Sequence, residues 1–565
     1  MQIIIENAAG CRIAERELRE DKNISFNMLN IGQELLSASG GRLVMKFSIP
    51  IIDMHGMWAT RKGFYRPVMK LPWSCEVAAS QQCDIPYVAF FDLDQCNSAT
   101  VALSCISDDT LIHFQMDQMR CSYAFTVTVA VREETEPFDL LISFRKIRWD
   151  LLTEDWRKLV LPEGKPQFSS DAFQPVYCTW YAVHAALTNE YLDKNARLAA
   201  QLGFRTFIVD DGWSYPEMKR VCPEKMAEGW YRDIGNWTVS GEKLPDFKKH
   251  VEYAQSLGLK YLLWVAPFFA GVSTPEYAGA KKADRDGSEL CSESWSDVAF
   301  LNPAGKTADH AVTLLCDLMR DLGLDGLKID FLDYVPNSVE KPRSRDCRAY
   351  FEKLSSSLRA IKADALFEFR QDYATPQMLK FGTQFRAGDV PFDFIDNIER
   401  LANIHITLGD RVPCHADPIY FHPEELPQNV AHHMIASLAG VPMLSMDLET
   451  LTDEQTRIIR FWLDFYQAHF HTFRNGHWDV FYFHDALKAM TVEDEKTLIA
   501  IVLDPAALTD AAVRAEEKNL TLFALNLTGS EITLEQAAAF DFEGNDTGSS
   551  SAPAGGGLMK KFCFG

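Results

Sequence analysis

Strand-like and helix-like segments alternate eight times between residues 175 and 470, and this alternation constrains the fold more than any other feature of the sequence. The first unit runs from the strand-like PVYCTWY at 175–181 into an amphipathic segment that ends at Gly203, and TFIVDDGW at 206–213 opens the second unit. Eight such units are typical of a (β/α)8 barrel. The rival, a doubly wound sheet, carries a G-x-G-x-x-G fingerprint, which this chain lacks. We therefore predict an α/β fold with a (β/α)8 TIM barrel over residues 170–470.

The segments on either side of the predicted barrel have a different pattern of apolar residues. Residues 1–165 contain short apolar runs such as RLVMKFSIPII and YAFTVTVAV, separated by polar breaks, which predicts an N-terminal β-sandwich domain. Residues 475–565 return to short strand-like runs such as TLIAIVLD, which predicts a small C-terminal β-sheet domain. A chain of 565 residues has room for these three units.

Charge and cysteine content exclude several classes of function. The formal net charge is −23, which argues against nucleic acid or an anionic membrane surface as the main partner. The N-terminus lacks a secretory signal pattern, and no apolar run is long enough to span a membrane. The 13 cysteines are scattered without a C-x-x-C pair, which is typical of reduced thiols in a cytoplasm. We expect no metal and no organic cofactor.

Alternation places two charged residues on one face of the predicted fourth barrel strand. In GLDGLKIDFLDYV at 322–334, Leu327, Ile329 and Phe331 should share one face. Lys328 and Asp330 should share the other face. This pair is part of a functional site if its face opens into a pocket, and an ordinary ion pair if it does not.

Carboxylates and tryptophans dominate the ends of the predicted strands, where barrels of this kind keep their active sites. Paired carboxylates suit the general acid and the nucleophile at an acetal carbon, and indole faces suit sugar rings. The structural alternatives are a turn at Asp210–Asp211, an internal Lys328–Asp330 ion pair, packing tryptophans and a structural Asp389. The polar and aromatic residues at strand ends are Trp180, Tyr181, Asp210, Asp211, Trp213, Trp264, Lys328, Asp330, Asp333, Glu368, Arg370, Asp372, Arg386, Asp389 and Asp447.

A series of motifs in residues 170–405 resembles glycoside hydrolase family 36, the melibiase-type α-galactosidases of clan D. The matches keep the family's order and spacing: CTWYA at 178–182, FIVDDGW at 207–213, GNW at 235–237, KLPDF at 243–247, LGLKYLLWVAP at 257–267, LNPAG at 301–305, LGLDGLKIDF at 322–331 and FIDNIERLANI at 394–404. The resemblance implies a barrel between two β-domains.

The resemblance assigns roles to individual residues. It implies that Asp330 is the nucleophile and that Lys328 contacts sugar hydroxyls beside it. The lysine cation should also help to keep the aspartate ionised. Asp210 and Asp211 would bind the hydroxyl groups of a galactose-like ring, and Trp180 and Trp237 would form the walls of its pocket. The chain departs from the family at EFRQDY (368–373), AGDVPFD (387–393), Ala266-Pro267 and Asn236, so the reaction type transfers better than the sugar.

Three aspartates compete for the role of general acid and base. Asp389 follows QFRAG, where a sixth strand would reach the top of the barrel. Asp393 follows Pro391 and should lie in the loop beyond, and Asp396 is placed to cap the next helix. We predict Asp389.

The predicted function is a cytoplasmic, retaining, exo-acting α-glycosidase for α-galactosides, with an oligosaccharide or glycoside as its partner. Arg370 and Arg386 raise the alternative of an anionic sugar, unless each simply pairs with Glu368, Asp372 or Asp389. A transglycosylase and a non-catalytic carbohydrate-binding relative also stay open. A homo-oligomer is compatible with the sequence.

Overall fold

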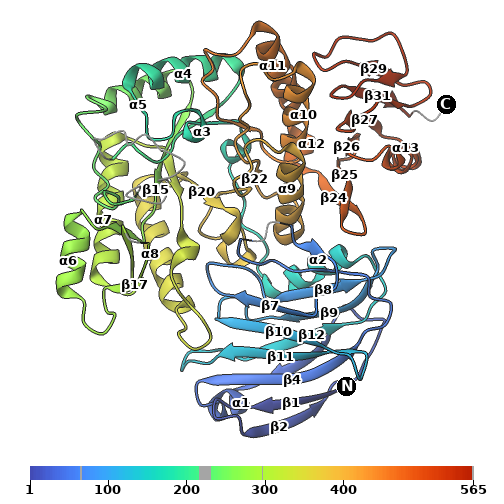
Figure 1. Ribbon diagram of the computed structural model, residues 1–565. Helices are drawn as coiled ribbons and strands as arrows, with labels where there is room; N and C mark the ends of the chain where they lie inside the picture. Colours follow the sequence, from blue (N-terminus) through green and yellow to red (C-terminus); the bar gives the residue numbers. More distant parts are fainter. Residues whose placement is uncertain (64–65, 215–230, 296, 563–565) are drawn as a thin grey trace.

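A computed structural model describes residues 1–63, 66–214, 231–295 and 297–562 (Figure 1). Along the chain it contains two antiparallel N-terminal sheets, an eight-stranded parallel barrel and a mixed C-terminal sheet. Among the described residues, no helix has the length and apolarity needed to cross a membrane.

Two six-stranded antiparallel sheets pack against each other at the N-terminal end of the chain. Their strand orders are β2-β1-β4-β11-β10-β7 and β3-β12-β9-β8-β5-β6. Phe90 of the second sheet meets Phe114 and Tyr123 of the first, with ring centroids 5.3 and 5.2 Å apart, so the predicted sandwich is confirmed. The elements are β1 (Gln2–Glu6), β2 (Arg12–Glu17), β3 (Asn27–Ile31), α1 (Gln33–Ala38), β4 (Arg42–Pro50), β5 (Gly56–Trp58), β6 (Val68–Met69), β7 (Ser74–Ala79), β8 (Tyr87–Phe91), β9 (Asn97–Leu103), β10 (Thr110–Asp117), β11 (Ser122–Ala130), β12 (Phe138–Ser143) and α2 (Trp149–Val160).

The barrel strands follow one another in the order β13-β14-β15-β19-β20-β21-β22, and β23 pairs with β13. A bridge from His415 to Val441 brings β22 to the segment before β23, so the barrel is nearly closed. The elements are β13 (Val176–Cys178), α3 (Trp180–Val183), α4 (Asn189–Leu202), β14 (Thr206–Val209), α5 (Phe247–Ser256), β15 (Lys260–Val265), α7 (Lys306–Leu322), β19 (Gly326–Ile329), α8 (Ser344–Ile361), β20 (Leu366–Arg370), β21 (Gln384–Arg386), α9 (Phe394–Leu408), β22 (Cys414–His415), α10 (Pro427–Ser437), β23 (Met443–Leu444), α11 (Asp453–Ala468) and α12 (Phe470–Asn475).

Local sequence explains where the barrel elements begin and end. Thr188 accepts a hydrogen bond from the backbone N–H of Tyr191 and so caps α4, and Gly203 ends this helix with a φ of 115°, which a side chain would disfavour. The strands are short apolar runs because both of their faces are buried: every residue of β14 and β19 is buried, including Lys328. The predicted (β/α)8 fold class is confirmed.

One predicted helix is absent. The sequence predicts a helix after each barrel strand, including TPQMLKFG (375–382) after the fifth. This segment forms only a short 3-10 turn, Pro376–Met378, so the prediction of a helix after every strand was wrong. Gln377 lies buried here and donates its side-chain N–H to the carbonyl oxygens of Ser80 (2.8 Å) and Asp84 (3.1 Å). The segment is therefore tied to the N-terminal sheets at the place where a helix would otherwise lie.

Two structured segments had no counterpart in the sequence prediction. Between β15 and α7 the chain forms a small three-stranded sheet and a helix: β16 (Phe269–Gly271), α6 (Pro275–Ala283), β17 (Leu290–Trp295) and β18 (Val298–Leu301). In the C-terminal part of the chain, α13 (Ala506–Lys518) connects the parallel strands β26 (Thr497–Val502) and β27 (Thr521–Asn526). Their sheet also contains β24 (His477–Phe483), β25 (Ala486–Glu493), β29 (Ala538–Phe540) and β31 (Gly557–Lys561), and a separate two-stranded sheet is formed by β28 (Ile532–Thr533) and β30 (Ser551–Ala552).

A loop of the N-terminal sheets docks on the barrel beside the ends of β19 and β20. The ammonium group of Lys62 lies 3.0 Å from the carboxylate of Asp333, and the backbone N–H of Gly63 donates to Asp372 (3.1 Å). Asp84 accepts the backbone N–H of Lys62 (2.8 Å) and so fixes the loop from behind. The N-terminal sheets thus hold the top of the barrel.

Candidate active site

A cavity of about 170 Å³ opens at the carboxyl ends of the barrel strands. It brings together all of the predicted site residues except Trp237, from six different strands or the loops that follow them. The lining residues are Trp180, Asp210, Asp211, Tyr231, Trp264, Lys328, Asp330, Phe331, Arg370, Arg386 and Asp389.

Asp330 is held by hydrogen bonds from neighbouring elements. It directly follows β19, and its side chain is buried. The indole N–H of Trp264 on β15 donates to one carboxylate oxygen at 2.9 Å, and the backbone N–H of Phe331 donates to the other at 2.9 Å. The Tyr373 hydroxyl lies 3.3 Å from this second oxygen. These donors orient the carboxylate and favour its charged form.

The charges around Asp330 keep it ionised. Burial alone would raise the pKa of Asp330, but the positive charges of Arg370, Lys328 and Arg386 outweigh burial and lower it. Arg370 is the direct neighbour, with its Nε 3.3 Å from the carboxylate. An ionised, oriented carboxylate at this position has the properties that a nucleophile needs.

Lys328 has a different direct partner from the expected one. Its ammonium group lies 2.5 Å from Asp210, and both side chains are buried. Burial lowers the pKa of Lys328, but the charge of Asp210 more than reverses this. Lys328 therefore ties β19 to the end of β14. As expected, its charge also lowers the pKa of Asp330, although Arg370 contributes more.

Arg370 contacts a second carboxylate of the cavity, that of Asp389. One of its terminal nitrogens lies 3.1 and 3.2 Å from the two oxygens of Asp389. Arg386 donates to Asp389 from both terminal nitrogens at 3.1 Å. Burial would raise the pKa of Asp389, but these two guanidinium groups pull it far below its usual range. Both arginines are thus paired with carboxylates of the site.

Arg386 also reaches carboxylates behind the cavity. Asp417 binds its guanidinium, and Glu368 lies 3.8 Å away. Asp417 further accepts the Tyr181 hydroxyl at 3.0 Å and the backbone N–H of Val390 at 2.7 Å. Burial raises the pKa of Asp417 to about 7 in spite of Arg386. The sequence gives only a weak indication that Asp417 belongs to the site: it lies two residues beyond the end of the seventh strand.

The structure separates the three aspartates that compete as general acid. Asp389 lines the cavity, with a side chain 45% exposed. Asp393 caps α9, where it accepts the backbone N–H groups of Ile395 and Asp396, both at 3.0 Å. Asp396 lies in the first turn of α9 and pairs with Arg66 at 2.5 Å. The prediction that Asp396 is the cap was wrong, because the helix begins one residue after Asp393.

The aromatic walls differ from the expected ones. Trp180 and Tyr231 line the cavity, but Trp237 lies behind Trp264, with ring centroids 6.3 Å apart. Phe331 also lines the cavity, although strict alternation predicted the opposite face. Its φ of 57° shows that the strand ends before it, and the chain turns. Trp264, which the sequence placed at a strand end without a role, lines the cavity and pairs in register with Lys328.

In the part of the chain that the structure describes, no group of three or more His, Cys, Asp and Glu side chains is arranged to hold a metal ion.

Comparison with known proteins supports a relation to α-galactosidases. No protein-family model matches the chain. An α-galactosidase of Escherichia coli is 28% identical over 103 residues, which are 18% of this chain and 13% of that protein. The α-galactosidase AgaA of Geobacillus stearothermophilus is 32% identical over 89 residues, 16% of this chain and 11% of that protein. The aligned segments thus span a small part of these curated relatives.

Solved structures extend the likeness to most of the chain. The GH36 α-galactosidase AgaB of Geobacillus stearothermophilus has a TM-score of 0.62 at 13% identity, over 89% of this chain and 78% of that chain. The α-galactosidase TtGalA of Thermus thermophilus has a TM-score of 0.57 at 13% identity, over 87% of this chain and 95% of that chain. Variants of AgaA have been solved in complex with stachyose and with raffinose. The predicted resemblance to family 36 is confirmed at the level of the fold.

Proposed function

We propose that the protein is a retaining, exo-acting α-glycosidase that hydrolyses terminal α-galactosides. The setting of Asp330 carries this proposal: an ionised carboxylate, oriented by Trp264, faces a cavity that also contains Asp389. The cavity of about 170 Å³ suits a single sugar ring better than a stretch of polysaccharide. The fold shared with GH36 α-galactosidases supports the choice of sugar.

In the proposed mechanism, Asp330 attacks the anomeric carbon and the glycosidic bond breaks. Asp389 gives its proton to the leaving oxygen, and a covalent glycosyl-enzyme forms. Asp389 then removes a proton from water, which attacks the same carbon and releases a sugar of retained configuration. Lys328, Asp210 and Asp211 would bind the hydroxyl groups of the ring.

The acid step places a condition on Arg370. Asp389 must carry a proton when the glycosidic bond breaks, whereas Arg370 and Arg386 favour its ionised form. Substrate binding therefore has to weaken the contact between Arg370 and Asp389. We expect Arg370 to remain paired with Asp330, its other carboxylate partner, in the substrate complex.

Arg370 also favours a second candidate, an α-sugar that carries a carboxylate or sulfonate group. One of its two counter-ions, Asp389, has a side chain 45% exposed, so an anion of the substrate could displace it from the guanidinium. Guanidinium groups bind such anions through paired hydrogen bonds.

A panel of aryl α-glycosides tests the proposal. It contains the galactoside, the N-acetylgalactosaminide, the glucoside, the galacturonide and the glucuronide with one common leaving group. We expect the highest kcat/KM for the galactoside. A clear preference for the uronides would support the second candidate, and no turnover of any member would reject both.

A further inference from the structure

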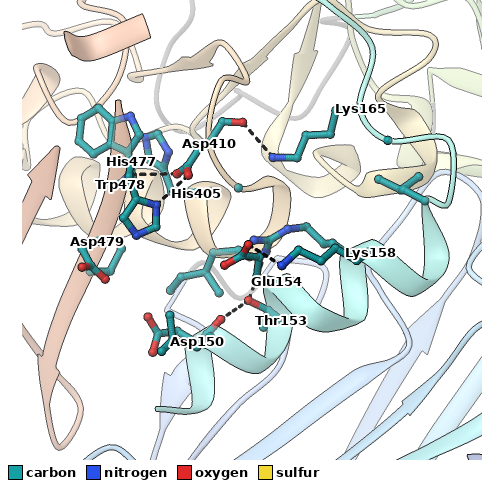
Figure 2. A pocket seen from close by; sticks show the side chains of 17 residues that line it. Asp150, Thr153, Glu154, Lys158, Lys165, His405, Asp410, His477, Trp478 and Asp479 are labelled. Carbon is teal, nitrogen blue, oxygen red and sulfur yellow. Dashed lines mark hydrogen bonds and ion pairs between the residues drawn. The ribbon is translucent and has the colours of Figure 1, made fainter. Parts of the chain in front are cut away.

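A second cavity, which shares no lining residue with the candidate active site, lies where three parts of the chain meet. It has a volume of about 200 Å³ and lies between α2, the loop after α9 and strand β24 (Figure 2). Its walls therefore come from the segment after the N-terminal sheets, from the barrel and from the C-terminal sheet. Nothing in the proposed hydrolysis uses this cavity.

Two cations converge on one wall of the cavity. Arg157 of α2 is 9% exposed, and its guanidinium donates to the carbonyl oxygen of Ile406 and to the Thr153 hydroxyl (3.2 Å). The ammonium group of Lys165 donates to the carbonyl oxygen of Asp410 (2.9 Å). A Cβ added to Gly409 would lie 2.8 Å from a terminal nitrogen of each cation, so the two charges lie close together.

The carboxylates of the cavity have other direct partners. Glu154 pairs with Lys158 at 2.8 Å, and Asp410 turns its carboxylate to His477 at 2.8 Å (Figure 2). Asp150 and Asp479 both pair with Arg148, at 2.5 and 3.1 Å. Within the described ranges of the chain, neither Arg157 nor Lys165 forms an ion pair with a carboxylate.

The end of α9 offsets these two charges only in part. The last carbonyl groups of a helix carry about half of an elementary negative charge. Arg157 and Lys165 together carry about two positive charges at neutral pH. Burial, and then the charge of Arg157, lowers the pKa of Lys165 to about 8, which shows that the two cations repel each other here. The charges of Asp410 and Glu154 offset the two cations further, but without a direct ion pair to either.

A buried histidine adds a neutral acceptor to the same cavity. The Nε2 of His405 hydrogen-bonds the carbonyl oxygen of Ala439 at 2.8 Å, and its Nδ1 has no partner, although the residue is only 6% exposed. Burial lowers the pKa of His405 to about 4, so the ring is neutral near pH 7. Its Nδ1 is a buried acceptor, so a ligand hydroxyl group would reach it only after the side chains around it shift.

We propose that this cavity binds a small phosphate-bearing ligand, with the phosphate between Arg157 and Lys165. The ligand is either inorganic phosphate or a phosphorylated sugar, whose hydroxyl groups would reach the His405 side of the cavity. Because the walls come from three parts of the chain, the bound ligand would hold α2, the barrel and β24 together and raise the stability of the whole protein.

Calorimetric titration and thermal unfolding of the full chain test this inference. Inorganic phosphate, galactose 1-phosphate and sodium chloride are compared at one ionic strength, so that general screening is the same in all. We expect saturable binding and a rise in Tm for at least one phosphate compound and not for chloride. A tighter Kd for galactose 1-phosphate that is lost in Lys165→Gln and kept in Lys328→Gln, a variant of the proposed active site, identifies the sugar phosphate as the ligand. Equal values for the two phosphate compounds identify free phosphate.

Variants assign the binding to the cavity. Lys165→Gln and Arg157→Gln should each weaken binding about tenfold or more, the value of a charge-assisted hydrogen bond. Lys158→Gln is the matched control, because Lys158 lies on the same helix but pairs with Glu154. If Arg157→Gln does not fold, the comparison of the binding isotherms of Lys165→Gln and the wild type decides whether the phosphate binds in this cavity. The absence of saturable phosphate binding, or an equal loss in the Lys158 control, would overturn the proposal.

Discussion

Arg370 lies 3.3 Å from the carboxylate of Asp330 through its Nε atom. The other end of the same guanidinium reaches Asp389 at 3.1 Å, so one cation joins the two carboxylates to which the proposed mechanism gives chemical roles. Arg370 lies in EFRQDY (368–373), a segment at which the sequence departs from the family motif that it resembles.

Replacing Arg370 should move the pH profile to higher pH. Arg370 lowers the pKa of Asp330 and of Asp389, each against the effect of burial. Without it both values rise: Asp330 ionises only at higher pH, and Asp389 keeps its proton to higher pH. Arg370→Gln should therefore shift both limbs of the kcat/KM profile upward, and Arg370→Lys should shift them less. An unchanged profile in Arg370→Gln would show that Arg370 does not act on these groups.

Replacing Asp389 should give the kinetic signature of a lost acid and base. Asp389→Ala should lose most activity on poor leaving groups and keep much of the first step on activated aryl glycosides, which need little protonation. Added azide should restore turnover and give a glycosyl azide of retained configuration. Asp393→Ala is the control, because Asp393 caps α9 and its loss should cost about 1 kcal/mol of stability without this signature. The reverse pattern would move the role to Asp393.

Removing the indole N–H of Trp264 should slow the reaction without unfolding the protein. Trp264→Phe deletes the 2.9 Å hydrogen bond to Asp330 and keeps an aromatic ring. A hydrogen bond to a charged group is worth about 1.5–3 kcal/mol, so kcat should fall by about 10- to 100-fold. Trp237→Phe makes a similar change in volume at the neighbouring ring, which does not line the cavity, and should leave kcat nearly unchanged. Equal losses in both variants would mean that packing alone is responsible.

Neutralising Asp84 should change how stability depends on pH. Burial raises the pKa of Asp84 to about 7, and the charge of Asp372 adds to this against the hydrogen bond from Lys62. A carboxyl whose folded pKa is raised binds more protons in the folded than in the unfolded state. The free energy of unfolding therefore falls as the pH rises from about 4 to 7. This group contributes at most about 1.4 kcal/mol per pH unit to the fall.

In Asp84→Asn this contribution disappears. Urea unfolding at pH 5, 6, 7 and 8 should show a smaller loss of stability with rising pH than in the wild type. Parallel curves for the two proteins would show that Asp84 does not carry this dependence.

The sequence predicted the barrel because local signals agree with the fold. The barrel strands are apolar on both faces, and helices such as α4 carry their own caps. Alternation also placed Lys328 and Asp330 together, since both lie before the chain turns. It failed at Phe331, because the left-handed backbone there ends the strand pattern.

The remaining errors concern contacts between distant segments. The partners of Lys328 and Arg370 depend on which strands lie side by side, and alternation along one strand does not contain that information. Trp237 has a φ of 49° and packs behind Trp264, which no local pattern indicates. The missing helix after β20 has the same origin, because Gln377 bonds to the N-terminal sheets.

Trapping the covalent intermediate tests the central claim most directly. An α-galactosyl substrate with an activated leaving group and a fluorine that slows the second step is incubated with the full chain, which is then digested and analysed by mass spectrometry. We predict one added sugar on the peptide that contains GLKIDF, with Asp330 as the modified residue, and no label in Asp330→Asn. A label on a different residue, or a β-anomer as the first product of an unmodified α-galactoside, would contradict the account.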